Sequence, residues 1–294
     1  LEGAEPTIKT QQHLDRCLTC RNCESTCPSG VEYGRLVDIG RSVVERKVGR
    51  STKEKFQRGV LRKGMLSKKT FAAALAMGRA ARPFLPASLK AKIQPRRAPG
   101  VWPTTAHSRT MLLLDNCVQD ALAPSIDAAA ARVLAAAGVT LQRVSAGGCC
   151  GALSHHLNAH DEAVQKVRAN IDAWWPLVER GAEAIVVTAS GCSVMVTDYG
   201  HFMKHDVVYA ERAAKIAALA RDVSEVIAAE WTKLKAKVKP ATEKIAYHPP
   251  CTLQHGMKLK GGVESLLKDM GFALAPVADS HLCCGSAGTY SILQ

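Results

Sequence analysis

Four residues of this chain recur at one fixed distance, and this repetition restricts the fold more than any other feature. The first copy of the set is Cys117, Cys149, Cys150 and Gly151, and the second copy, 134 positions later, is Cys251, Cys283, Cys284 and Gly285. Both copies place 31 residues between the first cysteine and the Cys-Cys-Gly motif. Four matches at a single offset indicate an internal duplication, so the chain should contain two related units.

The residues around the first copy alternate between short apolar runs and helical segments. Buried-strand patterns cover 111–115, 139–144 and 184–189, and helical patterns cover 125–137 and 162–180. Strands that alternate with helices of this length predict a parallel sheet covered by helices, which is a Rossmann-like α/β unit.

The second copy repeats this pattern over a shorter stretch. It has strands over 244–248 and 272–277 with a helix over 263–270 between them, after one long helix over 210–237 that is expected to end the first unit. The counterpart of Cys192 would fall at position 326, past Gln294. The second unit is therefore expected to be incomplete, and the chain to be a fragment.

The cysteines of both units follow the expected strands. The set consists of Cys117, Cys149, Cys150, Cys192, Cys251, Cys283 and Cys284. Open α/β sheets place their ligands beyond the carboxyl ends of parallel strands, so these thiols form a candidate second redox or metal site. Buried, inert cysteines are the alternative, although adjacent pairs at a fixed offset fit it poorly.

A second motif lies near the start, where 17–28 read C-L-T-C-R-N-C-E-S-T-C-P. The spacing of Cys17, Cys20, Cys23 and Cys27 is that of bacterial ferredoxins and predicts a 4Fe-4S cluster. In two-cluster ferredoxins the fourth cysteine ligates the other cluster, so Cys27 should serve a second one. The partner run would then lie upstream of this sequence. Structural zinc is the main alternative, but its ligands usually come from two separated pairs.

Cysteine usage and charge indicate the environment of the chain. Eleven cysteines without an export signal indicate a reducing, cytoplasmic compartment. Eighteen Lys or Arg residues lie between positions 41 and 109, against two acidic residues, although the whole chain carries a net charge of only +13. This basic segment could contact anionic lipids at the inner face of the membrane or form a solvated surface. No binding fold or aromatic pattern favours nucleic acid.

Four segments are expected from these features. They are a ferredoxin-type domain over 1–49, a basic helical connector over 50–108, a first cysteine-rich unit over 109–238 and a second, truncated unit over 239–294. The predicted fold class is therefore α/β, with a small α-helical ferredoxin-type domain and duplicated parallel α/β units. Prolines punctuate the connector, which favours a linker over a domain core.

Several histidines lie near the cysteines and are candidates for metal ligands or proton shuttles, with an ordinary structural role as the alternative. They are His155, His156, His248, His255 and His281. The sequence contains no G-x-G-x-x-G motif and no Walker loop, so no flavin or nicotinamide site is visible. Electrons for a cluster would then come from another chain.

The ferredoxin run, the stretch I-D-A-W-W-P-L-V-E-R-G-A-E-A-I-V-V-T-A-S-G-C, and the later C-T-L-Q-H and D-S-H-L-C-C-G-S-A-G-T-Y resemble a known family. They are similar to the iron–sulfur subunits of bacterial glycolate oxidase, over essentially the whole chain. The resemblance implies two 4Fe-4S clusters, with Cys17, Cys20 and Cys23 on one and Cys27 completing the other. It also implies flavin-containing partner subunits that carry FAD, oxidise glycolate and pass electrons towards quinone and the respiratory chain.

Related functions stay open at this point. The cysteine-rich repeats also resemble subunits of lactate and glycerol-3-phosphate dehydrogenases, and thiol–disulfide enzymes of the heterodisulfide reductase type. Met195 stands where the fuller repeat pattern has its last cysteine. A complete reductase-type site in the first unit is therefore not expected, and the substrate site should lie on a partner chain.

Overall fold

Three helices form the N-terminal part of the protein, whose computed structural model describes residues 3–285 and 288–293. They are α1 (Ile8–Asp15), α2 (Asn22–Thr26) and α3 (Tyr33–Val48). Helix α1 packs against α3, and the cysteine run lies in the connection between them, with α2 inside it. Buried Arg41 on α3 donates hydrogen bonds to the carbonyl oxygens of Leu14 and Cys17. The N-terminal part is therefore the small helical domain that the sequence predicts.

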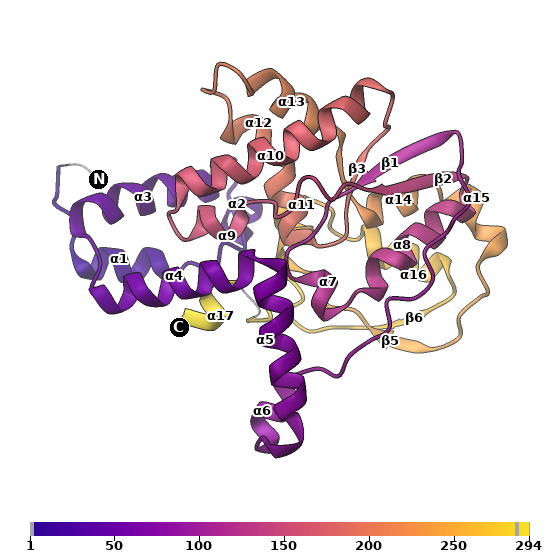
Figure 1. Ribbon diagram of the computed structural model, residues 1–294, viewed down its shortest axis with the longest axis horizontal. Helices are drawn as coiled ribbons and strands as arrows, with labels where there is room; N and C mark the ends of the chain where they lie inside the picture. The colour runs from indigo at the N-terminus through magenta and orange to yellow at the C-terminus, as the bar shows by residue number, and fades with distance from the viewer. Residues whose placement is uncertain (1–2, 286–287, 294) are drawn as a thin grey trace.

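The basic segment that follows is helical, as expected. It contains α4 (Thr52–Leu66), α5 (Lys68–Ala81), the 3-10 helix η1 (Arg82–Phe84) and α6 (Ala87–Lys92). Ser51 and Glu54 form a capping box at the start of α4, and Ser67 caps α5. Figure 1 shows α4 beside α1, and α5 leading down to α6 at the lower edge of the view.

A parallel four-stranded sheet forms the first α/β unit, with the strand order β2-β1-β3-β4. The strands are β1 (Arg109–Leu113), β2 (Val139–Arg143), β3 (Ile185–Val187) and β4 (Ala220–Asp222). Met111 pairs with Leu141, and Leu112 pairs with Ile185. The three strands that the apolar runs predict are confirmed, each within three residues of its expected ends.

Both faces of this sheet are buried, which is the usual state of a parallel sheet. Met111 and Leu113 pack with residues of α8 (Ser125–Ala136) and α14 (Val223–Ala229). Leu112 faces the other way, into a larger core formed by residues of three other helices. These are α10 (His160–Glu179), α11 (Ser190–Thr197) and α13 (Ala210–Leu219). Trp174 of α10 is fully buried in that core.

The prediction of one long helix over 210–237 is wrong. Helix α13 ends at Leu219, Ala220–Asp222 form β4, and the chain continues as α14, α15 (Trp231–Leu234) and η2 (Lys235–Lys237). The break has a local cause, because Asp222 accepts a hydrogen bond from the Ser224 backbone and forms a capping box with Glu225. An N-cap starts a new helix, and the three residues before it are free to extend the sheet.

The second unit contains two parallel strands, β5 (Lys244–Ala246) and β6 (Ala273–Ala275). Between them lie the π-helix η3 (Thr252–Gly256) and α16 (Gly262–Asp269), and α16 packs against α14 of the first unit. The short helices α7 (Gln119–Leu122), α9 (Ala152–His156), α12 (Tyr199–Phe202) and α17 (Tyr290–Leu293) complete the described chain. Within the described residues, none of the helices combines the length and apolar character that crossing a bilayer requires.

Candidate metal centre

The loop that carries the cysteine run is tightly wound. Thr19 and Arg21 have positive φ angles of 53° and 58°, a conformation that costs energy for a β-branched residue such as threonine. Cys17, Cys20 and Cys23 line one groove. Burial and the negative charges of Cys17 and Cys20 raise the pKa of Cys23, so the three thiols lie near one another. Soft thiol donors at this spacing can bind iron, zinc or a cluster.

Cys27 has a different environment. The backbone N–H groups of Val31 and Ser29 and the hydroxyl of Tyr33 lower the pKa of its thiol. Its surroundings are therefore the start of α3, at the other end of α2 from Cys20. A thiol whose pKa is lowered by hydrogen-bond donors is readily available as a thiolate ligand.

Three polar contacts hold the cysteine loop in place. Arg21 forms an ion pair with Asp198 of the first α/β unit, with 2.5 Å between Nη2 and Oδ2. Glu24 Oε1 accepts a hydrogen bond from the Gly34 N–H at 2.6 Å, and Arg41 donates to the Cys17 carbonyl at 2.9 Å. These contacts involve residues next to the cysteines, so the spacing of the thiols is fixed by the fold.

Four thiols of the first unit form a continuous group, here called the first thiol cluster: Cys117, Cys149, Cys150 and Cys192. Cys149 accepts hydrogen bonds from the thiols of Cys117 and Cys150, which lower the pKa of Cys149 to about 3. Hydrogen bonding to Cys149, together with burial, raises the pKa of both neighbouring thiols. The cluster follows β1, β2 and β3, so these four thiols lie at the sheet edge where the sequence places them, and their role as a redox or metal site stays a prediction.

The Cys-Cys-Gly loop is held by groups that the sequence analysis missed. Fully buried Asn170 accepts from the Gly148 N–H at 2.8 Å and donates to the Cys149 carbonyl at 3.0 Å. The Tyr199 hydroxyl donates to the Cys150 carbonyl at 2.8 Å. Gly151 has a φ of +91°, and a Cβ there would lie 3.3 Å from a backbone oxygen of α10. Only this last requirement has a sequence signal, the glycine itself.

The thiols of the second unit face the cysteine loop of the N-terminal domain. Cys251, Cys283 and Cys284 line the same groove as Cys17, Cys20 and Cys23. Burial, the thiol of Cys283 and the charge of Cys20 raise the pKa of Cys251 to about 12. The sequence predicts both sets of thiols but not their meeting, because it contains no local signal for contacts between distant segments.

The five candidate histidines separate into different roles. His255 is almost completely buried, and its ring nitrogens lie 2.9 Å from Ser25 Oγ and 3.0 Å from the His281 carbonyl oxygen. Because both of its nitrogens are engaged, His255 fits a structural role. His248 Nε2 lies 3.1 Å from the Leu282 carbonyl oxygen. The structure brings only His155 and His156 together with a carboxylate, that of Asp38, among the described residues.

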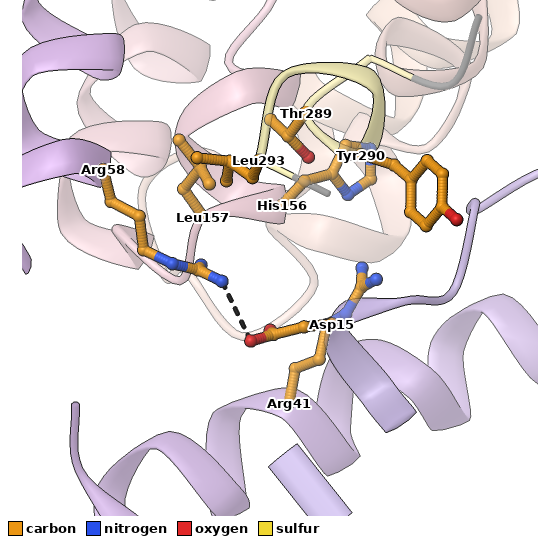
Figure 2. A pocket seen from close by; sticks show the side chains of 8 residues that line it. All are labelled: Asp15, Arg41, Arg58, His156, Leu157, Thr289, Tyr290 and Leu293. Carbon is orange, nitrogen blue, oxygen red and sulfur yellow. Dashed lines mark ion pairs between the residues drawn. The ribbon is translucent and has the colours of Figure 1, made fainter. Parts of the chain in front are cut away.

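His156 also lies beside a small cavity on the side of α1 and α4. Figure 2 shows its ring near Thr289 and Tyr290, with Arg41 and the Arg58–Asp15 ion pair across the gap. Burial, followed by the charges of His155 and Arg41, lowers the pKa of His156 to about 4, so its ring is neutral at pH 7. A cavity of about 10 Å³ is far too small for an organic ligand.

Comparison with known proteins agrees with this geometry. The family of CCG cysteine-rich domains matches residues 111–197 and 245–294, which lie within the two units that the repeat predicts. The glycolate oxidase iron–sulfur subunit of Escherichia coli (strain K12) is 48% identical over 299 residues, which cover 99% of this chain and 72% of that protein. The probable glycolate oxidase iron–sulfur subunit of Bacillus subtilis (strain 168) is 26% identical, covering 99% of this chain and 71% of its own length.

A more distant relative is similar to only part of this chain. Lactate utilization protein A of an Exiguobacterium species is 29% identical over 183 residues, which cover 61% of this chain and 72% of that protein. The two glycolate oxidase subunits match almost the whole chain, including the cysteine run, whereas this relative matches about three fifths of it. With its duplicated cysteine-rich domain and its high identity over nearly its full length, this chain belongs to the family of glycolate oxidase iron–sulfur subunits.

Proposed function

We propose that this protein transfers electrons, as the iron–sulfur subunit of a flavin-dependent glycolate oxidase, from flavin-containing partner subunits towards quinone. The observation that carries the proposal is the approach of Cys17, Cys20 and Cys23 in one groove. Three thiols in one tight loop fit three corners of a 4Fe-4S cluster. Such a cluster accepts one electron at a time, which suits a reduced flavin that gives up two electrons singly.

Cys27 is proposed to complete a second 4Fe-4S cluster. Its thiol lies in an environment of backbone N–H donors that differs from that of the other three cysteines. A hydrogen-bonded thiolate at the C-terminal end of α2 is suited to a ligand whose cluster lies outside the groove. We also propose a cytoplasmic location at the inner face of the membrane, where quinone is within reach.

The first thiol cluster is proposed to bind a metal or a cluster of its own. Cys149 and Cys150 are 6% and 3% exposed, which opposes thiol–disulfide exchange with an external substrate because exchange requires access to the attacking sulfur. Four neighbouring thiols, one of which has a pKa lowered by the others, are soft donors of the kind that zinc and iron bind. A metal site therefore fits this unit better than a reductase site.

The proposal is tested with Cys20→Ser in the complete complex, purified without oxygen. We expect the variant to lose iron, acid-labile sulfide and the paramagnetic resonance signal of the reduced cluster. It should also lose glycolate oxidation with quinone as acceptor. Ser29→Ala, at an exposed position of the same loop, is the matched control and should keep all four properties. Unchanged quinone reduction in Cys20→Ser, or zinc in place of iron in the unmodified protein, would contradict the proposal.

A further inference from the structure

The groove lined by Cys17, Cys20 and Cys23 extends well beyond the thiols. Its volume is about 1520 Å³, far more than a two-carbon acid such as glycolate occupies. Apolar side chains form much of its wall, among them Val37 of α3, Val164 of α10 and Phe202 of α12. A long groove with apolar walls beside a redox centre suits a flat, apolar molecule that exchanges electrons.

One polar pair lies on this wall. His155 Nε2 lies 3.1 Å from Asp38 Oδ2, and both side chains line the groove with about a fifth to a quarter of their surface exposed. Phe202 contacts the His155 ring edge to face at 5.1 Å and fixes its orientation. A carboxylate that pairs with an imidazole in this way orients the ring, and a histidine held like this can pass a proton to a bound ligand.

The charges around the pair argue against a metal ion, although Asp38, His155 and His156 are close enough to bind one. Burial would raise the pKa of Asp38, but the hydrogen bond from His155 and the charges of both histidines and Arg41 lower it. Arg41 and Arg21 also act on His156, whose pKa they help to lower. The positive charges of Arg21 and Arg41 repel a divalent cation. They attract a ligand that becomes negative on reduction.

We propose that the groove binds a quinone head group and that His155, held by Asp38, donates a proton to its carbonyl oxygen during reduction. This inference rests on the proposed electron-transfer function and adds the site at which the quinone receives the electrons. A reduced iron–sulfur centre held by Cys17, Cys20 and Cys23 would supply the two electrons, one at a time. Two protons convert the quinone to a quinol, one passed on by His155 and one from water, and His155 regains its proton from solvent.

The test compares the rate of reduction of an acceptor that takes up protons with the rate for one that does not. In the complete complex, with glycolate as reductant, His155→Gln should lower the kcat with decylubiquinone at least tenfold. Reduction of ferricyanide, which takes an electron without a proton, should stay within twofold. His13→Gln, at an exposed site on α1, is the matched control and should change neither rate. If both rates fall together, or if neither falls, His155 is not the proton donor.

A second variant and a binding measurement test the groove itself. Val164→Phe should raise the KM for decylubiquinone several-fold and leave ferricyanide reduction unchanged, because a larger side chain narrows the apolar wall. A photoreactive azidoquinone should label peptides of α3 and α10, and excess decylubiquinone should prevent this labelling. Labelling confined to other segments would overturn the proposal. Should Cys20→Ser abolish quinone reduction while His155→Gln and Val164→Phe have no effect, only this inference fails and the electron-transfer function stands.

Discussion

Asn170 shows how one side chain can hold a cysteine motif that it does not belong to. Its amide satisfies the Gly148 N–H and the Cys149 carbonyl, and it also donates to the Tyr199 hydroxyl at 3.0 Å. The Cys149 carbonyl and the Tyr199 hydroxyl are buried at these contacts, so each would lose its hydrogen bond without gaining another. The geometry of the first thiol cluster therefore depends on a residue of α10, about twenty positions away in sequence.

Asn170→Ala is expected to lower the free energy of unfolding by about 3 kcal/mol, because it leaves buried donors and acceptors without partners. The measurement is urea unfolding followed by circular dichroism, together with the metal content of the folded protein. Glu179→Ala, at an exposed position of the same helix, should change stability by less than about 0.5 kcal/mol. Equal stability of the two variants would mean that Asn170 does not hold the loop.

Glu230 gives a prediction about pH. Hydrogen bonds from Arg109 and Lys233, each 2.7 Å long, outweigh burial and lower the pKa of this carboxyl to about 2. A lowered pKa means that the ionised group stabilises the fold above its ordinary pKa of 4.5, and that this contribution is lost as pH falls from 4.5 towards 2. Glu230→Gln should therefore be less stable than the unmodified protein at pH 7, and the difference in urea midpoint should shrink between pH 4 and pH 3. A difference that does not change with pH would contradict this.

Among the helices and strands, the sequence predicts those that belong to the repeat or that contain a strongly apolar run. The runs at 111–115 and 184–189 indicate buried strands because both faces of a parallel sheet are covered. Ala220–Asp222 has no such run, since this strand has three residues and its middle one, Arg221, is exposed. The capping pattern at Asp222 and Glu225 could have indicated the break between α13 and α14. It was missed because the residues on both sides favour a helix.

Asp222 is expected to matter more than its place in a short strand suggests. Its carboxylate accepts from the Ser224 N–H at 3.0 Å and from the Ser193 hydroxyl at 2.9 Å, so it joins the start of α14 to α11. Asp222→Ala should lower the free energy of unfolding by about 2 kcal/mol. Asp222→Asn, which keeps an oxygen for the cap, should cost less than about 1 kcal/mol. Thermal or urea unfolding compares them, and equal losses would show that the cap does not determine where α14 begins.

For the whole molecule, the sequence locates the thiols but not the surfaces that bring them together. The spacing of Cys17, Cys20 and Cys23 is local and can be read directly, whereas their approach to Cys251 depends on how the second unit packs on the N-terminal domain. The same holds for Asp38 and His155, which are more than one hundred residues apart and belong to different segments. Such contacts arise from the packing of whole elements, and a single sequence carries no periodic signal for them.

His255 provides a measurable link between these distant parts. Its ring joins Ser25 of α2 to the His281 carbonyl of the loop that carries Cys283 and Cys284. Because His255 is 5% exposed, replacing it removes a hydrogen bond on each side and leaves a cavity between the two segments. We expect His255→Ala to raise the amide hydrogen exchange of both 22–27 and 281–285, two segments that are far apart in sequence.

Ser25→Ala completes a double-mutant cycle with His255→Ala. It removes only the contact with α2, so exchange should rise in 22–27 and much less in 281–285. If Ser25 and His255 act through their shared hydrogen bond, the double variant should be more stable, by about 1 kcal/mol, than the sum of the two single losses predicts. Strictly additive losses, or a change confined to the second unit, would show that the cysteine loop and the second unit are held together by other contacts. The ion pair between Arg21 and Asp198 would then be one of the contacts that arrange the thiols around the groove.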